Sequence, residues 1–435
     1  MIRCGWLRFT VTRLKPVRSR EGARISRWRL KRDIFGLGLL QVAVTGVVLA
    51  ALVATANGLS SAQLAAAHPV SGGTYEYGHE FVHPVAGFTA GWMFLAAKSA
   101  SAATAALGCA GYLLHAFGAP GDAVWRVALA LGIVLTLTAL VAGGVKRSNT
   151  VNIAIVSVTL LALASFVAFG WLAIDTSLLA ERIGPSTWVD ALSTPSALFH
   201  ATALVFVAYT GYGRIATLGE EVREPARTIP RAIIMTLLVT MVLYVAVATT
   251  AIAAVGPRAF AGTTRGAAAP LEVVATTFSE PWVAGVVATG AVTAMAGVLL
   301  NLLLGLSRVL LAMARRREMP AALDRISAET NSPTRAVLAI GGLISALVLF
   351  GDVKTTWSFS AFTVLTYYGI TNLAALRLPP EARRFPRWIA LAGLLSCFGL
   401  AFFVPWQIWL AGLGLLGAGM VWRAAARRGG KRENY

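Results

Sequence analysis

The sequence has little that catalysis or metal binding requires. Its 435 residues include only 19 Asp and Glu and three scattered cysteines, Cys4, Cys109 and Cys397. These cysteines form neither a disulfide framework nor a redox motif. The histidines show no metal-ligand spacing, and they are His68, His79, His83, His115 and His200. No His–Asp, Ser–His or metal set falls at one predicted depth, so the residues indicate no enzyme and no cofactor or metal.

Charge is also scarce, and this excludes a soluble fold. Charged residues make up 13% of the chain, hydrophobic residues make up 57%, and the mean hydropathy is +0.70. Apolar runs of about 18 residues or more recur, and one soluble core could not bury them. These runs do not alternate in polarity as the strands of a membrane barrel do. The predicted class is therefore an all-α polytopic membrane protein.

The net charge of +19 does not indicate nucleic-acid binding. A nucleic-acid protein gathers Lys and Arg on one soluble face. Here they lie mostly in short clusters between apolar runs, where the positive-inside effect places them. We expect membrane lipid, and no nucleic acid, around this chain.

Eleven hydrophobic spans are predicted, with no large soluble domain between them. They lie at 36–60, 84–116, 123–145, 151–174, 196–218, 231–255, 281–314, 335–352, 357–376, 386–403 and 405–423. Alternate connections are rich in Lys and Arg, as in 315–317 and 383–387, so all of these fall on one side, which should be cytoplasmic. The sequence predicts a multi-pass protein of the cytoplasmic membrane, with a transmembrane domain at 36–425 and a basic cytoplasmic tail at 426–435.

One span contains an interruption. An apolar helix begins at Leu198, and its pattern loosens at Ala208, Tyr209, Thr210, Gly211, Tyr212 and Gly213. A helix broken inside a membrane leaves N–H and C=O groups that hydrocarbon cannot satisfy, so these groups must face protein, water or a ligand. Secondary transporters bind substrate at broken helices of this kind.

Three stretches together resemble the amino acid–polyamine–organocation (APC) permeases. The interrupted helix, followed by Glu220-Glu221-Val222-Arg223-Glu224-Pro225 and then Arg227, Pro230 and Arg231, resembles the sixth helix and its cytoplasmic loop. The stretch 64–77, which includes Pro69, Gly72, Gly73 and Tyr75, resembles the loop after the second helix. The stretch 307–320 resembles the end of the eighth helix. The resemblance covers about 45–425 and implies an inverted-repeat transporter fold with broken helices.

The basic arm at 1–35 does not fit this pattern. It holds eleven Lys or Arg, and loop parity places it outside, where positive charge is disfavoured. The resemblance implies twelve helices, of which the first, Gly-rich helix is absent here. One interpretation is a truncated or out-of-frame start, with the arm aberrant or disordered. The other is a diverged arm that lies on anionic lipid headgroups.

The resemblance also implies how a substrate is held. Unwound backbone at Ala208–Gly213, together with the first helix, would bind the carboxylate and ammonium of an amino acid. Tyr209 and Tyr212 would gate or line the side-chain pocket. The alternative is that Gly211 and Gly213 only allow close helix packing.

Lys98 lies about fourteen residues inside the 84–116 span, too deep to reach the interface easily at about 1.5 Å per residue. A charge at that depth is costly, so Lys98 should face the protein interior. It could carry a proton or replace a coupling ion. Alternatively, it bonds carbonyls of a neighbouring helix for structural reasons.

Other polar residues carry weaker indications. Glu220, Glu221, Arg223 and Arg231 are predicted to form a cytoplasmic salt-bridged loop, which either holds the inward gate or is simply solvated. Pro225 and Pro230 should stop helix formation and place Arg231 at the next helix start. Further minor candidates are Asn301 and Ser307 as ion-site residues, Tyr367 and Tyr368 as pathway or packing residues, His115 as an interfacial residue, and Glu272 and Glu280 as solvated residues.

The sequence thus predicts a secondary transporter of amino acids or related amines, driven by protons or by exchange. The lack of an acidic residue in any span argues weakly against a dedicated cationic substrate. The alternative is a transport-deficient membrane protein of the same fold. Because the first helix would supply half of the carboxylate site, we expect the chain as written to bind amino acids poorly.

Overall fold

The computed structural model is built from helices, and no strand occurs among the residues that it describes. Those residues are 20–70, 72–119, 122–144, 149–174, 195–217, 222–263, 269–327, 329–330, 332–350 and 352–430. The longer helices are α1 (Arg20–Ala67), α3 (Pro84–Ala116), α4 (Ala123–Ala142), α5 (Asn149–Ala173), α8 (Pro195–Tyr209), α9 (Pro225–Val255), α12 (Trp282–Arg315), α13 (Thr334–Phe350), α14 (Val353–Leu376), α15 (Arg387–Ala401) and α16 (Trp406–Gly430). The shorter ones are α2 (Thr74–Phe81), α10 (Pro257–Thr263), α11 (Pro270–Ala275) and the 3₁₀ helices η1 (Thr210–Thr217), η2 (Ala321–Leu323) and η3 (Pro380–Ala382).

Length and composition confirm the all-α polytopic membrane class. In the described part of the chain, eight helices are long and apolar enough to cross a membrane. Thr334–Leu349 and Arg387–Ala401 are apolar but shorter. The segment predicted as one span at 196–218 is divided between α8 and η1. The inverted-repeat relation stays a prediction.

The first predicted span, 36–60, ends too early. Its membrane candidate ends at Ala67, so the span holds Asn57 and continues past Gln63. These side chains are buried and bonded rather than exposed at a membrane surface. The amide of Asn372 donates to Asn57 Oδ1 at 2.6 Å, and Gln63 Oε1 accepts from the backbone N–H of Arg384 at 3.4 Å. Polar side chains that find partners inside the bundle can extend a span, and hydropathy alone does not detect this.

Two helices include parts of the chain's charged terminal segments. Helix α1 begins at Arg20, inside the predicted arm, and residues 1–19 lie outside the described residues. Helix α16 continues to Gly430 through part of the predicted tail.

Helix starts follow ordinary capping chemistry. Pro84 opens α3, where its missing N–H costs nothing, and His83 Nδ1 accepts from the backbone N–H of Val85 at 3.1 Å. Asp352 caps α14 by accepting from the N–H of Thr355 at 2.7 Å. Helix α9 begins at Pro225 and contains Pro230, so the prediction that Pro230 holds off the helix until Arg231 is wrong. Pro230 lies in the second turn, where only one carbonyl loses its partner.

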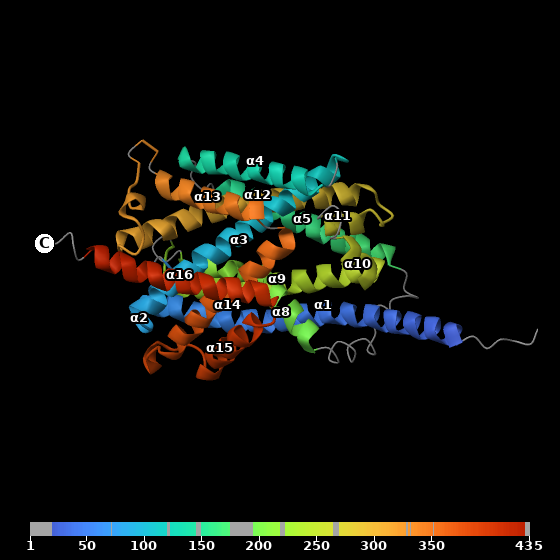
Figure 1. Ribbon diagram of the computed structural model, residues 1–435, viewed down its shortest axis with the longest axis horizontal. Coiled ribbons are helices and arrows are strands. Elements are labelled where there is room, and N and C mark those ends of the chain that lie inside the picture. Colours follow the sequence, from blue (N-terminus) through green and yellow to red (C-terminus); the bar gives the residue numbers. More distant parts are fainter. Residues whose placement is uncertain are drawn as a thin grey trace, which may run out of the picture.

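The long helices run roughly along the long axis of the molecule (Figure 1). One hydrophobic cluster joins α1, α3, α8, η1, α9, α14 and α15, and a second joins α3, α4, α12 and α13. Helix α3 contributes to both, so it is the common wall of the bundle. Many apolar side chains elsewhere on α5, α9 and α15 are exposed, as expected of surfaces that face lipid.

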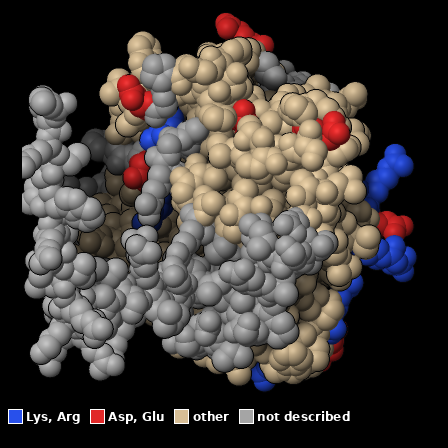
Figure 2. Space-filling model, turned by 90° about the vertical axis from the view of Figure 1, so that its right-hand side faces the viewer, with Lys and Arg blue, Asp and Glu red and all other residues tan. Residues whose placement is uncertain are grey.

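Contacts between segments distant in sequence define two ends. At one end, α16 meets the C-terminus of α12, where Trp422 Nε1 donates to the carbonyl of Glu318 at 2.9 Å. Helix α2 joins them there through the ion pair of Glu76 with Arg316. The basic connections around Arg316 and Arg377 lie at this end, on the left in Figure 1. The described part of the opposite end is mainly uncharged, with Lys and Arg mostly at its edge (Figure 2).

Candidate substrate site

The predicted interruption is confirmed. The α-helix of α8 ends at Tyr209, and the backbone continues as the 3₁₀ helix η1 from Thr210 to Thr217. The segment is therefore tightened rather than unwound, and eight residues is long for a 3₁₀ helix, which is typical of hinges and strained segments. The change in hydrogen-bond pattern releases carbonyl groups at the end of α8.

Hydroxyl and indole groups of neighbouring helices occupy these carbonyls. Tyr244 of α9 donates to Ala208 O at 3.0 Å, and Tyr368 of α14 donates to Thr210 O at 3.2 Å. Trp357 Nε1 of α14 donates to Leu204 O at 2.8 Å, one turn earlier. Sequence reasoning missed Tyr244 and Trp357, since nothing in their local pattern shows which helix they face. The resemblance implied that these carbonyls would be free to bind a substrate ammonium. Each instead accepts one hydrogen bond from the protein and has a second lone pair that could still accept another.

The segment Ala208–Gly213, which we call the break, contains two glycines with different surroundings. A Cβ at Gly213 would overlap the hydroxyl of Tyr368, so Gly213 is needed for close packing. Gly211 is exposed, and nothing lies within 4 Å of the position a Cβ would take. The interpretation that glycine allows close helix packing therefore holds for Gly213. At Gly211, by contrast, the backbone is exposed and no side chain that the structure describes covers it.

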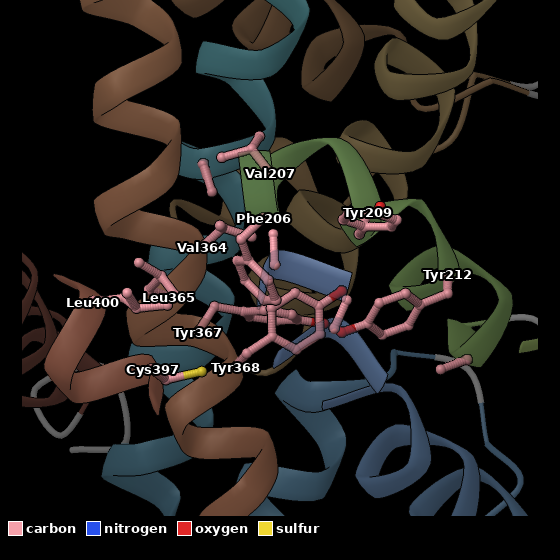
Figure 3. Packing of buried hydrophobic residues seen from close by; sticks show 14 of the residues in the cluster. Phe206, Val207, Tyr209, Tyr212, Val364, Leu365, Tyr367, Tyr368, Cys397 and Leu400 are labelled. Atoms are coloured by element: carbon pink, nitrogen blue, oxygen red, sulfur yellow. The ribbon is translucent and has the colours of Figure 1, made fainter. Parts of the chain in front are cut away.

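The tyrosines of the break are buried. Tyr209 is 2% exposed, with its ring 4.9 Å from that of Tyr244. Tyr212 is fully buried and points from η1 toward Tyr368, 5.4 Å between ring centroids (Figure 3). Tyr367 and Tyr368 stack edge to face at 4.9 Å. These four rings are therefore packed inside the bundle next to the break.

Lys98 reaches the same point from α3. Its Nζ donates to Thr210 Oγ1 at 2.9 Å, and the Thr210 hydroxyl donates onward to Val207 O at 2.7 Å. The structure therefore brings together two sequence-predicted features that lie 112 residues apart. Lys98 faces the protein interior as predicted, but its partner is a hydroxyl at the break rather than a set of carbonyls.

The predicted gate loop is only partly described. Glu220 and Glu221 lie outside the described residues. Arg223 and Arg231 are exposed. The ion pair seen here joins Glu224 and Arg227 at 3.9 Å, with both side chains more than 70% exposed, so its contribution to stability is small.

The minor candidates have structural partners. Asn301 Nδ2 donates to Asn152 Oδ1 at 3.2 Å, which ties α12 to α5, and Ser307 Oγ bonds back to Leu304 O. Among the residues that the structure describes, no cluster of His, Cys, Asp or Glu could hold a metal ion.

Glu272 was expected to be solvated, and this is wrong. Its carboxylate is 9% exposed on α11 and lies 3.9 Å from His115 Nε2. Burial raises the pKa of Glu272, and the nearby His115 opposes this rise. The short helices α10 and α11 were not predicted, so their burial of this carboxylate could not be anticipated.

A charged cluster at the basic end was also missed. We call it the end cluster, and it comprises Tyr75, Glu76, His79, Arg316 and Glu318. Glu318 accepts from Tyr75 OH at 2.8 Å and from His79 Nε2 at 3.2 Å, while Arg316 pairs with Glu76. The pKa of Tyr75 is raised well above its usual range, by burial first and then by the Glu318 carboxylate. Two of the family-like stretches meet here, and that shared resemblance was the available signal.

The chemistry of the break is that of binding rather than bond making. It offers open backbone at Gly211, one lysine ammonium at Thr210 and a wall of tyrosines. The Thr210 hydroxyl donates its proton to Val207 O and accepts from Lys98, so Lys98 does not activate it as a nucleophile. Such a site can hold a small polar molecule and release it unchanged.

Comparisons with known proteins show which family the chain resembles. The family model described as amino acid permease matches residues 31–422. An uncharacterized transporter of Mycobacterium tuberculosis is 40% identical over 390 residues, which cover 88% of this chain and 82% of the relative. The branched-chain amino acid permease BcaP of Bacillus subtilis is 27% identical over 85% of this chain and 82% of its own length. The vacuolar cationic amino acid transporter 4 of Arabidopsis thaliana is 26% identical over 77% of this chain and 57% of its own length. These names describe transporters and not enzymes.

Proposed function

Because this chain belongs to the amino acid permease family, we propose that it is a secondary transporter that moves amino acids or related amines across the cytoplasmic membrane. The observation that carries the proposal is the junction at Tyr209–Thr210, where an α-helix becomes a 3₁₀ helix beside the open backbone of Gly211. Backbone groups from Ala208 to Gly213 would bind the part that all amino acids share. Tyr209 and Tyr212 would support that backbone from beneath.

Lys98 is the proposed coupling residue. Its ammonium is fixed at the break by Thr210, where a bound cation or a transferred proton would act on the same helix junction. A lysine that gains and loses a proton there would couple transport to a proton gradient. A lysine that stays charged would stand in for a coupling ion, and transport would then run by exchange.

The basic end is the proposed cytoplasmic end, with the C-terminal helix leading into it. Arg316, Arg377 and the N–H of Arg384 all contact segments at this end. The positive-inside rule favours this orientation. In the same orientation, the loop of Glu220, Glu221, Arg223 and Arg231 would lie at the inward mouth of the pathway and act as its gate.

The test is uptake by the purified protein in liposomes. A panel of the twenty labelled amino acids and of polyamines is offered with an imposed proton gradient, without one, and against internal unlabelled substrate. We expect uptake of at least one amino acid above that of empty liposomes. Stimulation by the gradient would assign proton coupling, and stimulation by internal substrate would assign exchange. A folded protein that takes up none of the panel under any condition contradicts the proposal.

A further inference from the structure

We infer that the site at Gly211 admits substrates without net positive charge, and that Lys98 is the residue that sets this selectivity. The inference rests on the proposed function, since it names the substrate class of that site. It follows from where Lys98 lies, from what its ammonium contacts and from the charges of the surrounding helices.

The direction of the Lys98 hydrogen bond is determined by its neighbours. The Thr210 hydroxyl donates its one proton to Val207 O, so Thr210 Oγ1 must accept the hydrogen bond from Lys98. Lys98 is therefore present as a donor at the first residue of η1, adjacent in sequence to Gly211. An ammonium has three N–H donors, and Thr210 uses one of them. The other two suit a carboxylate, which is the strongest acceptor an amino acid carries.

The helices around the site supply no negative charge to balance Lys98. The sequences of α3, α8, η1, α9, α12 and α14 contain no Asp or Glu, and neither does the part of α1 from Val44 to Ala67. The η1 helix adds a second cation, Arg214, whose charge acts on Lys98. Two carboxylates, Glu76 and Glu318, take part in ion pairs of the end cluster, away from Lys98. A zwitterionic substrate brings a carboxylate to Lys98 and leaves the site balanced. A substrate with a second ammonium adds an unpaired positive charge in a poorly hydrated place.

The tyrosines do not offer an alternative cation site. A cation could bind over an open aromatic face. The rings here face one another instead, with Tyr209 against Tyr244 and Tyr212 against Tyr368. The hydroxyls of Tyr244 and Tyr368 donate to carbonyls of the break, and the hydroxyl of Tyr209 donates to Val47 O on α1. The apolar and aromatic wall favours an uncharged side chain.

The size of the effect follows from Coulomb's law. Two positive charges about 8 Å apart at an effective dielectric constant of about 20 repel enough to weaken binding by about 30-fold. Specificity of this kind arises from repulsion of the wrong substrate as much as from attraction of the right one.

Three amino acids with one carbon skeleton test the inference. Norleucine has an uncharged end, lysine carries an ammonium there, and 2-aminoadipate carries a carboxylate. Each is measured by the rise in melting temperature of the purified protein, and by competition with labelled norleucine for uptake into liposomes. The variants are Lys98→Met, which removes the charge, and Lys98→Arg, which keeps it. Gly132→Ala on α4, where nothing lies within 4 Å, serves as the control.

We expect the wild type, K98R and G132A to prefer norleucine over lysine by about 30-fold. K98M should bind norleucine more weakly and bring the two ligands to within about threefold, since both the carboxylate partner and the repulsion are gone. Equal binding of lysine and norleucine by the wild type overturns the inference. An unchanged preference in K98M also overturns it, because the selectivity then lies elsewhere.

Loss of folding in K98M does not obscure the result, because the wild-type preference and K98R are read independently. If none of the three ligands binds to a protein that does take up another amino acid, the inferred substrate class is wrong but the transport function stands. Failure of the entire twenty-amino-acid panel contradicts the transport function itself.

Discussion

The break and the end cluster solve the same problem in different ways. Both hold segments together with polar groups, but at the break the Lys98 ammonium meets a neutral hydroxyl, and the carbonyls accept from neutral donors such as Tyr244 and Tyr368. The end cluster uses both signs of charge, with Arg316 on Glu76 and His79 on Glu318. A carboxylate is costly in the middle of a membrane and tolerable at its edge. The difference teaches that interior positive charge without a neighbouring carboxylate on the same helices is suited to a ligand, whereas charges of opposite sign paired at an edge are suited to structure.

The largest effect should come from crowding the break. Gly213→Ala places a methyl group on the Tyr368 hydroxyl, so we expect a loss of about 1–3 kcal/mol in the free energy of unfolding and loss of uptake. Thermal unfolding in detergent and liposome uptake measure both. The double variant G213A with Y368F removes the overlapping oxygen and should recover part of the loss. Full stability in G213A alone would show that the break does not require this close contact.

The next effect should be structural and confined to the end cluster. Glu318→Gln replaces the charged acceptor of Tyr75 and His79, and we expect a loss of about 1–3 kcal/mol in unfolding free energy. Substrate affinity should stay unchanged, because Glu318 contacts neither η1 nor Lys98. The exposed Glu329→Gln on the following connection is the matched control. A change in affinity larger than the change in stability would make the two regions one functional unit.

A smaller effect is expected from the hydroxyls that occupy carbonyls at the break. Tyr244→Phe removes one neutral donor from Ala208 O and should cost about 0.5–1.5 kcal/mol of stability. The carbonyl that loses this donor lies next to the proposed site. The affinity of Y244F for a substrate should therefore change by a few fold, whereas the affinity of E318Q should not change. Affinity is read from uptake at a series of substrate concentrations. Identical affinity in Y244F and wild type would separate this carbonyl from the substrate.

The smallest effect concerns Glu272 at the opposite end. Burial raises its pKa in the folded state, so the folded protein binds this proton more tightly than the unfolded chain. The penalty for ionising Glu272 is therefore absent at low pH, and it appears as pH rises through and above the ordinary carboxyl range. Glu272→Gln should raise the melting temperature by about 2 °C at pH 7 and give no gain near pH 4. The exposed Glu280→Gln should show neither change, and a gain that is constant with pH would refute the assignment.

Much of the fold could be predicted from the sequence, because apolar runs indicate membrane-spanning helices and basic connections indicate which ends of these helices share a side of the membrane. The break was readable for the same reason, since glycines and small residues interrupt a run at Ala208–Gly213. The partners of the break were not, because Tyr244 and Trp357 reach it only through helix rotations that hydropathy does not fix. The buried polar residue Gln63 extended a span past its predicted end for a similar reason. Lys98 was recognisable as unusual, but its contact with Thr210 required the packed bundle.

Binding of a labelled amino acid to Gly211→Ala, compared with Gly132→Ala, tests the central claim most directly. Both glycines have open space at the Cβ position, so both variants should fold and be at least as stable as the wild type. If open backbone at the break holds the substrate, a methyl group at Gly211 should weaken binding at least tenfold, while G132A binds as the wild type does. Wild-type affinity in a folded G211A protein would contradict the account.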